Sequence, residues 1–236
     1  MKLLITGSTG IAGAAASLAR ERGHAVVTIG LDPSADVIAD LRNEAETTDA
    51  FDAALQRLGG VDALFNAAGG SARRFGDGAW HECSLEGFRA AFEMNVQTTF
   101  LITKVVLRHW LAAKAPGAVL SLGSVLANSP EPQHFSSHAY AGAKGALVAM
   151  TKSAAARYAG QGIRFNLLAP GLVRTPMSQR AQENEDIMRF VRAKQTLSGG
   201  ILEPDAVARM ALFLLSDEAR DVTGQVMAID GGWSVL

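Results

Sequence analysis

Tyr140 and Lys144 lie four residues apart in the stretch SSHAYAGAKGALVAM, residues 136–150. On a helix this spacing places both side chains on the same face. A phenol with the usual pKa of ~10 is a poor base at neutral pH, and lowering that pKa to ~7 takes roughly 4 kcal/mol. An ammonium within ~4–6 Å lowers the pKa of an acid by about 1–3 units, so we expect Lys144 to prepare Tyr140 for proton transfer. The second tyrosine, Tyr158, is followed four residues later by Gly162 and has no such cation.

A glycine-rich turn follows the first predicted strand, in TGSTGIAGAAASLAR, residues 6–20. Gly7, Gly10 and Gly13 allow a tight turn, close approach of the backbone to a pyrophosphate, and close packing of helix on strand. The first N–H groups of the helix then face the phosphates, and the helix dipole favours negative charge there. Glycine makes up 24 of 236 residues, so the spacing also arises by chance in ordinary turns. Its position between a strand and a helix favours dinucleotide binding.

The end of the second predicted strand bears on the choice of dinucleotide. An acidic side chain near this point binds the adenosine ribose hydroxyls and favours NAD over NADP. Gly30 stands where that acid is expected, and Asp32 follows it before Pro33. Asp32 either reaches the ribose through a tight turn or is a solvated turn residue. No lysine or arginine lies in the glycine turn or directly after the strand to bind a 2′-phosphate, so NAD(H) is predicted over NADP(H).

The elements that must position these residues alternate along the chain. Alternating strands and helices predict an α/β fold, a Rossmann-like doubly wound parallel sheet of about seven strands with helices on both faces. Several strands are apolar at consecutive positions, which is typical of strands covered on both sides. The gap between the second and third strands is too short for a helix, and no linker divides the single domain 1–236. Strands are predicted at 2–6, 25–30, 36–39, 62–66, 118–123, 163–169 and 225–230, and helices at 11–22, 48–58, 85–114, 139–159, 177–194 and 204–215.

The composition excludes several classes of protein. Hydrophobic residues at 48% and charged residues at 19% indicate a globular core. The net charge of −1 gives no reason to expect nucleic acid or an anionic membrane as partner. Cys83 is the single cysteine, which excludes an internal disulfide, and the five histidines show no metal-ligand spacing. The apolar start of the chain is too short for a signal peptide and no later run has spanning length, so a cytoplasmic location is expected.

Several short motifs follow one another along the chain. They are TGSTGIAG (6–13), NAAG (66–69), Asn95 in MNVQTTF, Ser124 in SLGSV, YAGAK (140–144), APGLVRTPM (169–177) and VTGQVMAIDGG (222–232). Each motif alone is weak, but the ordered set resembles the short-chain dehydrogenase/reductase family over nearly the whole chain. The resemblance implies an NAD(P)-dependent oxidoreductase that interconverts a secondary alcohol and a ketone by hydride transfer.

The resemblance also implies roles for four residues. Tyr140 would be the general acid/base, and Lys144 would hold the nicotinamide ribose hydroxyls. Ser124 would donate a hydrogen bond to the substrate oxygen, where charge develops. Asn95 would hold a water that links Lys144 to solvent, and because asparagine is unfavourable within a helix, something should compensate. The alternatives are a strand-end serine that satisfies the backbone and a lysine on a helix surface.

Further residues would bind the cofactor by the same resemblance. Ala67 replaces the second asparagine that the family usually carries in NAAG, and the glycine turn has the spacing of the family's longer branch. Small residues at 141–143 would let the cofactor ribose approach closely. The predicted cofactor-binding set is Gly7, Ser8, Thr9, Gly10, Ile11, Asp32, Asp40, Leu41, Asn66, Ala67, Ala68, Gly69, Tyr140, Lys144, Pro170, Gly171, Val173 and Thr175.

The substrate side is less defined. Segment 125–138 and the substrate-loop region 176–202 should flank the cleft, because loops beyond the carboxyl ends of strands do so. Arg73 and Arg74 would favour an anionic substrate, although an ordinary surface pair is the simpler interpretation. Candidates for substrate contact, which are equally typical of solvated loops, are His134, His138, Arg174 and Gln179.

Two other functions and an assembly follow from the resemblance. A dinucleotide-binding regulator without turnover is one alternative, although such proteins usually lack one of the four reacting residues. An epimerase or dehydratase is the other; the glycine spacing favours it, but those relatives use an extra C-terminal region that is not found here. Relatives commonly form tetramers through two long helices, so a homo-oligomer, a tetramer or dimer, acting on a small molecule is expected. The substrate and the direction of the reaction stay open.

Overall fold

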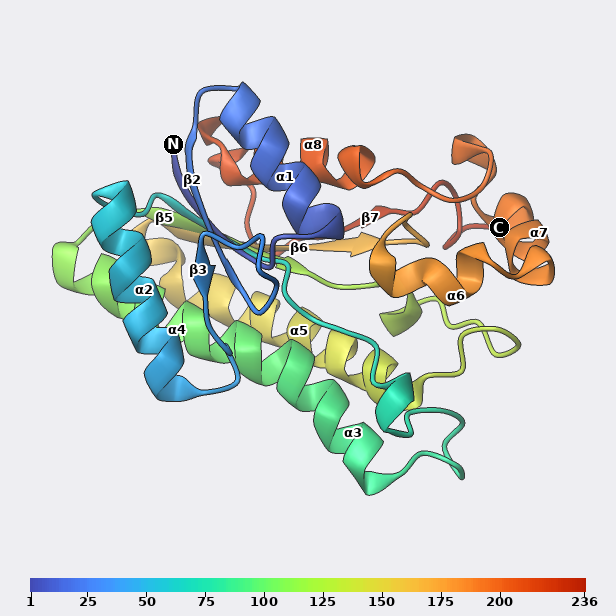
Figure 1. The fold of residues 1–236 in the computed structure, drawn as a ribbon. Coiled ribbons are helices and arrows are strands. Elements are labelled where there is room, and N and C mark those ends of the chain that lie inside the picture. Colours follow the sequence, from blue (N-terminus) through green and yellow to red (C-terminus); the bar gives the residue numbers. More distant parts are fainter.

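A seven-stranded sheet organises the chain in the computed structural model, which describes all residues 1–236 (Figure 1). The strand order is β3-β2-β1-β4-β5-β6-β7, and every neighbouring pair is parallel. This confirms the predicted doubly wound sheet. The strands are β1 (Lys2–Thr6), β2 (Ala25–Gly30), β3 (Val37–Ile38), β4 (Ala63–Asn66), β5 (Gly117–Leu122), β6 (Ile163–Pro170) and β7 (Val226–Ile229).

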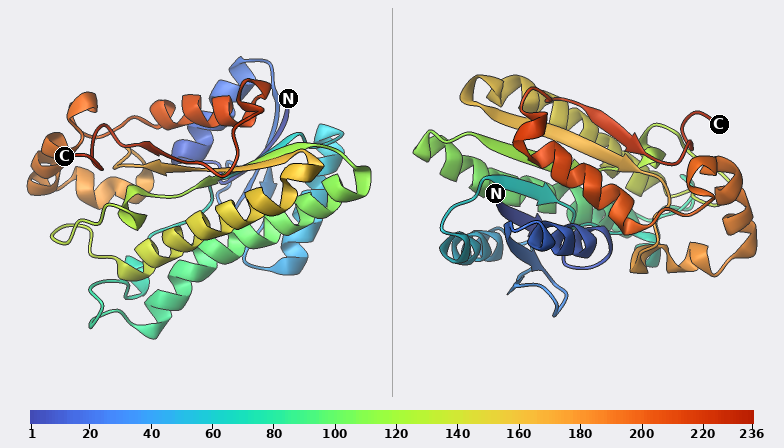
Figure 2. Two further views of the ribbon diagram at one scale, coloured as in Figure 1. Left: turned by 180° about the vertical axis from the view of Figure 1, so that it is seen from behind. Right: turned by 90° about the horizontal axis from the view of Figure 1, so that it is seen from above.

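Helices cover both faces of the sheet, as predicted (Figure 2). Helices α1 and α8 pack together on one face, and α2, α4 and α5 lie on the other. The helices are α1 (Gly10–Glu21), α2 (Glu44–Leu58), α3 (Leu85–Phe92), α4 (Thr98–Ala113), α5 (His138–Tyr158), α6 (Gln179–Gln182), α7 (Glu185–Lys194) and α8 (Pro204–Leu215). None of them is long and apolar enough to cross a membrane.

The consecutive apolar residues of the strands divide between two cores. Successive side chains of a strand point to opposite faces of the sheet. Leu3 and Ile5 therefore join the 21-residue core beneath α1 and α8, whereas Leu4 joins the 18-residue core against α2 and α4. All three are fully buried, and burial of such a side chain contributes about 1.5–3 kcal/mol. This two-sided burial explains why the strands show no polar alternation.

The helices differ from prediction in three places. Helix α2 begins at Glu44, four residues before the predicted start at 48. The predicted helix 85–114 is continuous in space, but residues Glu93–Gln97 form a π-helical turn between α3 and α4. The predicted helix 177–194 is wrong, because two short helices occupy it. Asn184 begins the second of them, α7, by accepting a hydrogen bond from the Ile187 N–H at 3.0 Å. The link between β2 and β3 is a loop, as expected.

The topology places the loops that matter at one edge of the sheet. The chain runs outward from β1 to β3, then returns to β4 beside β1 and continues to β7. The order therefore reverses between β1 and β4, and in such sheets ligands bind beyond the carboxyl ends of the strands at this point. Figure 1 shows α6 and α7 beyond the arrowhead of β6, on the same side as the loop that follows β5.

Candidate active site

A cavity of about 510 Å³ opens at this carboxyl edge. It is bounded by the loops that follow β1, β4, β5 and β6 and by the first turns of α5. Ser124, Tyr140 and Lys144 all line it. Asn95 lies behind the cavity wall and is fully buried. The fold thus brings together three of the four reacting residues that the sequence singled out, with the fourth directly behind them.

Tyr140 and Lys144 occupy one face of α5, as their spacing predicts. The Lys144 Nζ lies 5.6 Å from the centre of the Tyr140 ring and donates a hydrogen bond to the Leu122 carbonyl at 2.7 Å. The end of β5 therefore fixes the ammonium. Ser124 follows β5 directly, and its hydroxyl accepts the Leu126 N–H at 3.2 Å, which orients the side chain at the start of the next turn.

In the free protein the pKa of the Tyr140 phenol is raised, whereas pairing with Lys144 is expected to lower it. Burial raises the pKa of Tyr140 to about 12, and a hydrogen bond with Ser124 offsets this only in part. Burial also lowers the pKa of Lys144 to about 8. Removal from water disfavours the charged form of each group. In the free protein, desolvation therefore keeps the phenol protonated at neutral pH. The lowering of the Tyr140 pKa by Lys144 together with an oxidised nicotinamide stays a prediction.

Asn95 sits inside the π-helical turn and holds a neighbouring loop. Its amide nitrogen donates to the carbonyls of Ala91 at 2.8 Å and Gly70 at 3.0 Å, and its oxygen accepts the Gly70 N–H at 3.2 Å. These bonds compensate an asparagine within a helix. A Cβ at Gly69 would lie 2.5 Å from the Asn95 oxygen and 3.4 Å from the Lys144 Nζ, so only glycine allows this approach. Single π turns are frequent at functional sites.

The glycine turn has the shape that the sequence predicts. Gly7 and Gly10 have positive φ angles of 86° and 54°, which favour glycine. A Cβ at Gly10 would lie 3.0 Å from the Thr175 side chain, so the turn packs against the segment after β6. Gly13 approaches the Ser8 carbonyl so closely that a Cβ there would lie 2.6 Å from its oxygen. Thr9 begins α1 without a side-chain cap, and no acidic residue occupies the first turn.

The exit of β4 is tied to the exit of β1. The Thr6 hydroxyl accepts the N–H groups of Ala67 and Ala68, each at 3.0 Å. Asn66 points away from the cavity, because its side-chain nitrogen donates to the Thr103 hydroxyl at 2.9 Å. Its buried side-chain oxygen has no partner. Of the predicted NAAG contacts, the three residues after Asn66 line the cavity.

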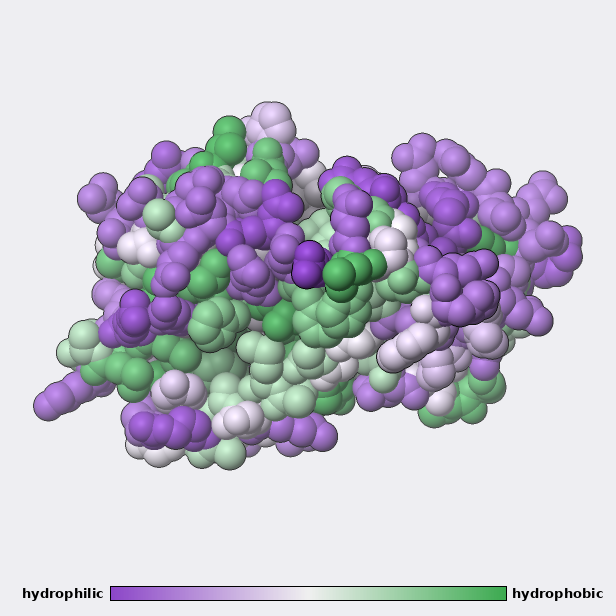
Figure 3. Space-filling view, turned by 90° about the horizontal axis from the view of Figure 1, so that it is seen from below, coloured by the Kyte–Doolittle hydropathy of each residue, from purple (hydrophilic) through white to green (hydrophobic).

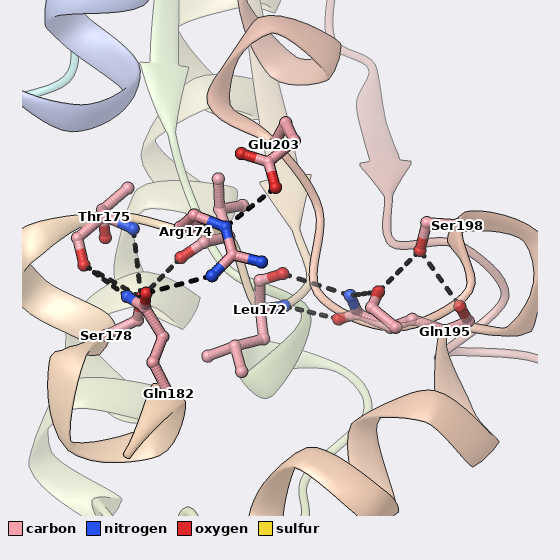
Figure 4. A network of polar contacts seen from close by, with 10 residues as sticks. Leu172, Arg174, Thr175, Ser178, Gln182, Gln195, Ser198 and Glu203 are labelled. Carbon is pink, nitrogen blue, oxygen red and sulfur yellow. Dashed lines mark hydrogen bonds and ion pairs between the residues drawn. The ribbon is translucent and has the colours of Figure 1, made fainter.

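A polar network holds the segment after β6 (Figure 4). The fully buried Gln195 accepts the Leu172 N–H at 2.5 Å and donates to the carbonyls of Leu172 and Gly200. Arg174 pairs with Glu203 at 2.8 Å, so its side chain braces the loop and lies outside the cavity lining. All four residues predicted to face the nicotinamide from this segment line the cavity: Pro170, Gly171, Val173 and Thr175.

The predicted adenosine contacts lie beyond the cavity lining. The exposed Asp32 carboxylate accepts the Ser34 N–H and hydroxyl, which lower its pKa. The Ser34 hydroxyl also donates to the Ser8 hydroxyl at 2.9 Å, which links this loop to the glycine turn. Asp40 is engaged by the Arg42 guanidinium, and Leu41 is buried in the core. Contact of Asp32, Asp40 and Leu41 with a nucleotide stays a prediction.

The small residues between Tyr140 and Lys144 lie outside the cavity lining. A Cβ at Gly142 would meet nothing within 4 Å, and Gly142 is exposed on the outer side of α5. Ala143 is fully buried and lies outside the cavity lining. Close approach of a ribose to these positions stays a prediction. They leave the outer face of α5 flat.

The residues that line the substrate side of the cavity are not the ones that the sequence favoured. None of the four loop residues predicted to contact the substrate lines the cavity, because each uses its side chain elsewhere. The His138 ring bonds the Gly78 carbonyl, the His134 ring packs on Phe190, and Gln179 bonds Glu183, while Arg174 has its ion pair. Arg73 and Arg74, interpreted as a surface pair, do line the cavity, together with Arg180.

Two residues near the site are not predicted from the sequence. Asp77 is buried, and its carboxylate accepts the N–H groups of Ala139 at 3.0 Å and Tyr140 at 3.1 Å. It therefore anchors the first turn of the helix that carries Tyr140. Arg180 lies in the predicted substrate-loop region, but no spacing or motif distinguishes it from the region's other charged residues.

Comparison with known proteins supports the family that the motifs resemble. A family model described as Enoyl-(Acyl carrier protein) reductase matches residues 5–234, which is nearly the whole chain. The chain belongs to the short-chain dehydrogenase/reductase family. A family relative, 2,5-dichloro-2,5-cyclohexadiene-1,4-diol dehydrogenase of Sphingobium indicum, is 34% identical over 236 residues, covering 100% of this chain and 91% of the relative.

Solved structures share the family fold. A short-chain type dehydrogenase/reductase from Mycobacterium ulcerans superposes with a TM-score of 0.88 at 28% identity, covering 99% of this chain and 90% of that one. A 3-ketoacyl-(acyl-carrier-protein) reductase from Brucella melitensis, solved in complex with NADH, has a TM-score of 0.85 at 28% identity and covers 99% and 98%. The fold is therefore that of the short-chain dehydrogenases/reductases.

Proposed function

We propose that the protein is an NAD(P)-dependent oxidoreductase that interconverts a secondary alcohol and a ketone. The observation that carries this proposal is the convergence of Ser124, Tyr140 and Lys144 on one cavity that also reaches the glycine turn. A proton donor, a hydrogen-bond donor for an oxygen, and a cation thus stand beside a surface suited to a dinucleotide. The named activity of the Sphingobium relative, a diol dehydrogenase, supports the same reaction class.

The residues around the glycine turn fit a dinucleotide. The first N–H groups of α1 have no side-chain cap and no acid beside them, whereas α2, α7 and α8 each carry acidic residues in their first turns. A free helix N-terminus of this kind suits a pyrophosphate. The cavity lining holds four basic side chains and no aspartate or glutamate. The Brucella reductase, solved with NADH, supports a nicotinamide dinucleotide, and the predicted preference for NAD(H) is kept as part of the proposal.

The chain's own residues would handle the proton. When bound, a nicotinamide dinucleotide donates or accepts the hydride. In ketone reduction, the Tyr140 hydroxyl donates its proton to the oxygen that gains charge, and in alcohol oxidation the phenolate takes that proton back. Ser124 donates a hydrogen bond to the same oxygen. Lys144, held by the Leu122 carbonyl, keeps a positive charge within reach of the phenolate and of the ribose hydroxyls.

The pKa of Tyr140 determines what each direction of the reaction requires. A phenol with a pKa of about 12 is a ready proton donor but a weak source of phenolate at neutral pH. Reduction therefore needs no change in the pKa of Tyr140. Oxidation needs added positive charge beside the phenol, which Lys144 supplies in part and an oxidised nicotinamide increases.

The two alternative functions are less well supported. A regulator without turnover has no need of the complete set of Asn95, Ser124, Tyr140 and Lys144, and here all four retain defined partners or line the cavity. An epimerase or dehydratase would use the same cofactor turn, but nothing in the cavity favours it over simple alcohol oxidation. The alcohol–ketone reaction accounts for the site with the fewest assumptions.

Replacement of Tyr140 by phenylalanine tests the proposal directly. We expect Tyr140→Phe to lower turnover of any accepted ketone or alcohol by at least about 100-fold, because the proton donor is lost. The Kd for NADH, measured by fluorescence titration, should change by less than roughly threefold. Tyr158→Phe is the matched control, because Tyr158 packs on Phe165 away from the cavity. Full activity in Tyr140→Phe would show that the proton comes from elsewhere.

A further inference from the structure

Three arginines bound the cavity and lack acidic partners. Arg73 and Arg74 lie in the 3-10 turn Arg73–Phe75, and Arg180 lies in α6. None of them belongs to the protein's seven ion pairs. Arg74 is exposed and stacks on the Phe75 ring, whereas Arg73 is half-buried. The more enclosed cation of the turn is therefore Arg73.

Arg73 and Arg180 converge on one backbone oxygen. The Nη2 atoms of both side chains donate to the His134 carbonyl, at 3.4 Å from Arg73 and 2.9 Å from Arg180. Each guanidinium has five N–H donors, and this is the single hydrogen bond that each one makes. The Phe135 ring lies 5.9 Å from the Arg180 guanidinium and helps to hold it in place. Most donors of the Arg73–Arg180 pair are thus available to a ligand.

The pair carries two like charges, and neither guanidinium forms an ion pair with an acidic side chain. Burial lowers the pKa of Arg73, and the charge of Arg180 lowers it further. Asp77 is the nearby acid that opposes this shift, but its carboxylate already accepts the N–H groups of Ala139 and Tyr140. Arg180 is exposed, but it adds a second positive charge beside the half-buried Arg73, and a partly buried cation is costly unless an anion compensates it. The arrangement therefore favours an anionic ligand between the guanidinium groups.

The pair is attached to the segments that carry the reacting residues. His134, the shared acceptor, lies between Ser124 and Tyr140 in the chain, in the loop that leads into α5. Arg73 follows the Gly69–Gly70 backbone that Asn95 holds beside Lys144. An anion bound by the pair would therefore belong to the molecule whose oxygen faces Ser124 and Tyr140.

We propose that the Arg73–Arg180 pair binds an anionic group of the substrate, so that the substrate is a hydroxy or keto compound that also carries a carboxylate or a related oxyanion. The inference rests on the proposed alcohol–ketone reaction and narrows its substrate class. Guanidinium groups bind carboxylates, phosphonates and phosphates through paired N–H donors, which fixes the orientation of the ligand as well as its charge. The ketone carbon is then positioned by two anchors, the reacting residues and the arginine pair.

Matched acids and esters test the inference with the full chain and NADH. The carboxylate probes are acetoacetate, 4-oxopentanoate and 5-oxohexanoate, each compared with its methyl ester; 2-oxopropylphosphonate is compared with its dimethyl ester. We expect at least one acid to exceed its own ester by roughly tenfold or more in kcat/KM, the usual scale of a charge-assisted contact. The pair with the largest ratio identifies the oxyanion as a carboxylate or a phosphonate.

Variants assign the preference to the two arginines. Arg73→Gln and Arg180→Gln should each lower the acid-to-ester ratio toward one, and Arg180→Lys should restore part of it. Arg209→Gln on the exposed side of α8, outside the cavity, is the control that leaves the ratio unchanged. Equal loss for acid and ester would mean that the pair only braces the His134 loop, and this would overturn the inference.

The outcomes separate the inference from the proposed function. Ketones that are turned over with equal kcat/KM for every acid and ester would overturn the anion site and leave the oxidoreductase intact. If no ketone is turned over, the proposed function fails, and calorimetric titration of 4-oxopentanoate and 2-oxopropylphosphonate into the NADH-treated protein decides the anion site alone. Binding in the native chain that is lost in Arg73→Gln and Arg180→Gln would support it, and no binding of either acid would overturn it.

Discussion

At the scale of single residues, the site depends on how burial sets the charge of Tyr140 and Lys144. Both groups are protonated at neutral pH, with pKa values of about 12 and about 8. A free enzyme in this state is prepared to reduce a ketone, because the phenol holds a proton to donate and the ammonium holds its charge. Oxidation must first generate phenolate against the cost of burial. The direction of the reaction is thus coupled to pH.

The pH dependence of ketone reduction follows from these values. The folded pKa of Lys144 is lowered, so its charge is lost as the pH rises through about 8, while Tyr140 stays protonated until about 12. We expect kcat/KM for NADH, which reports the free enzyme, to be flat near neutrality and to fall as the pH rises through about 8. Lys152→Met, on the exposed side of the same helix, should keep the profile. Reduction that accelerates above neutrality would contradict the assigned protonation states.

We expect Asp32 to set the preference between the two dinucleotides. Its carboxylate is ionised, since the hydrogen bonds from Ser34 lower its pKa, and Ser34 connects it to the glycine turn through Ser8. A 2′-phosphate nearby would be repelled by this negative charge. NADH should therefore bind roughly fivefold more tightly than NADPH, and Asp32→Asn should bring the two Kd values together. Asp49→Asn, on the exposed face of α2, serves as control. Tighter binding of NADPH by the unaltered chain would exclude this role of Asp32.

At the scale of elements, the loop before α3 and the start of α5 depend on Asp77. Its carboxylate accepts two N–H groups of the first turn of α5, where the helix dipole also favours negative charge. We expect Asp77→Ala to lower the free energy of unfolding by about 2 kcal/mol, because the two donors lose a buried acceptor. Urea unfolding followed by circular dichroism measures this. Asp52→Ala on the exposed face of α2 should change it by less than ~0.5 kcal/mol. Equal stability of the two variants would remove Asp77 from the support of the helix.

Local patterns predicted most of these elements and only part of their arrangement. The strands were predicted within a residue or two, because two-sided burial requires consecutive apolar residues, as in β1 and β4. The spacing of Tyr140 and Lys144 is likewise a local property of one helix. The break between α6 and α7 was not predicted, since it depends on one capping side chain, Asn184.

The parts of the site that sequence reasoning missed depend on contacts between distant segments. Arg73 and Arg180 meet at the His134 carbonyl although they lie on separate loops, and nothing in either local sequence marks the encounter. The pKa values of Tyr140 and Lys144 in the free protein follow from tertiary burial, which the spacing of the two residues does not reveal. Spacing therefore predicted which groups meet, but not how the surrounding protein sets their charge.

At the scale of the whole molecule, one face exposes apolar side chains that no other part of the chain covers. Figure 3 views the molecule from the side of α3, α4 and α5 and shows a band of pale and apolar residues between hydrophilic margins. Phe100 and Leu111 of α4 and Met150 of α5 are 49%, 41% and 36% exposed. The open positions at Gly142 and Gly145 leave α5 flat, so that another backbone can approach closely. A second copy of the chain with the same helices would cover this face through a symmetric contact.

Oligomerisation through this face is the predicted consequence. Light scattering after size exclusion should give a mass of two or four times 24.8 kDa for the unaltered chain. Phe100→Arg and Ala149→Arg introduce charges on the exposed surfaces of α4 and α5, and an unpaired charge inside an interface costs several kcal/mol, so both variants should dissociate toward the monomer. Leu197→Arg is the matched control, because Leu197 is 90% exposed but lies near the substrate loops. If Leu197→Arg is the only variant that lowers the mass, the contact between copies lies at the substrate loops instead. A native chain that is monomeric at micromolar concentration would contradict the predicted contact through α4 and α5. It would also mean that a single copy forms the whole cavity.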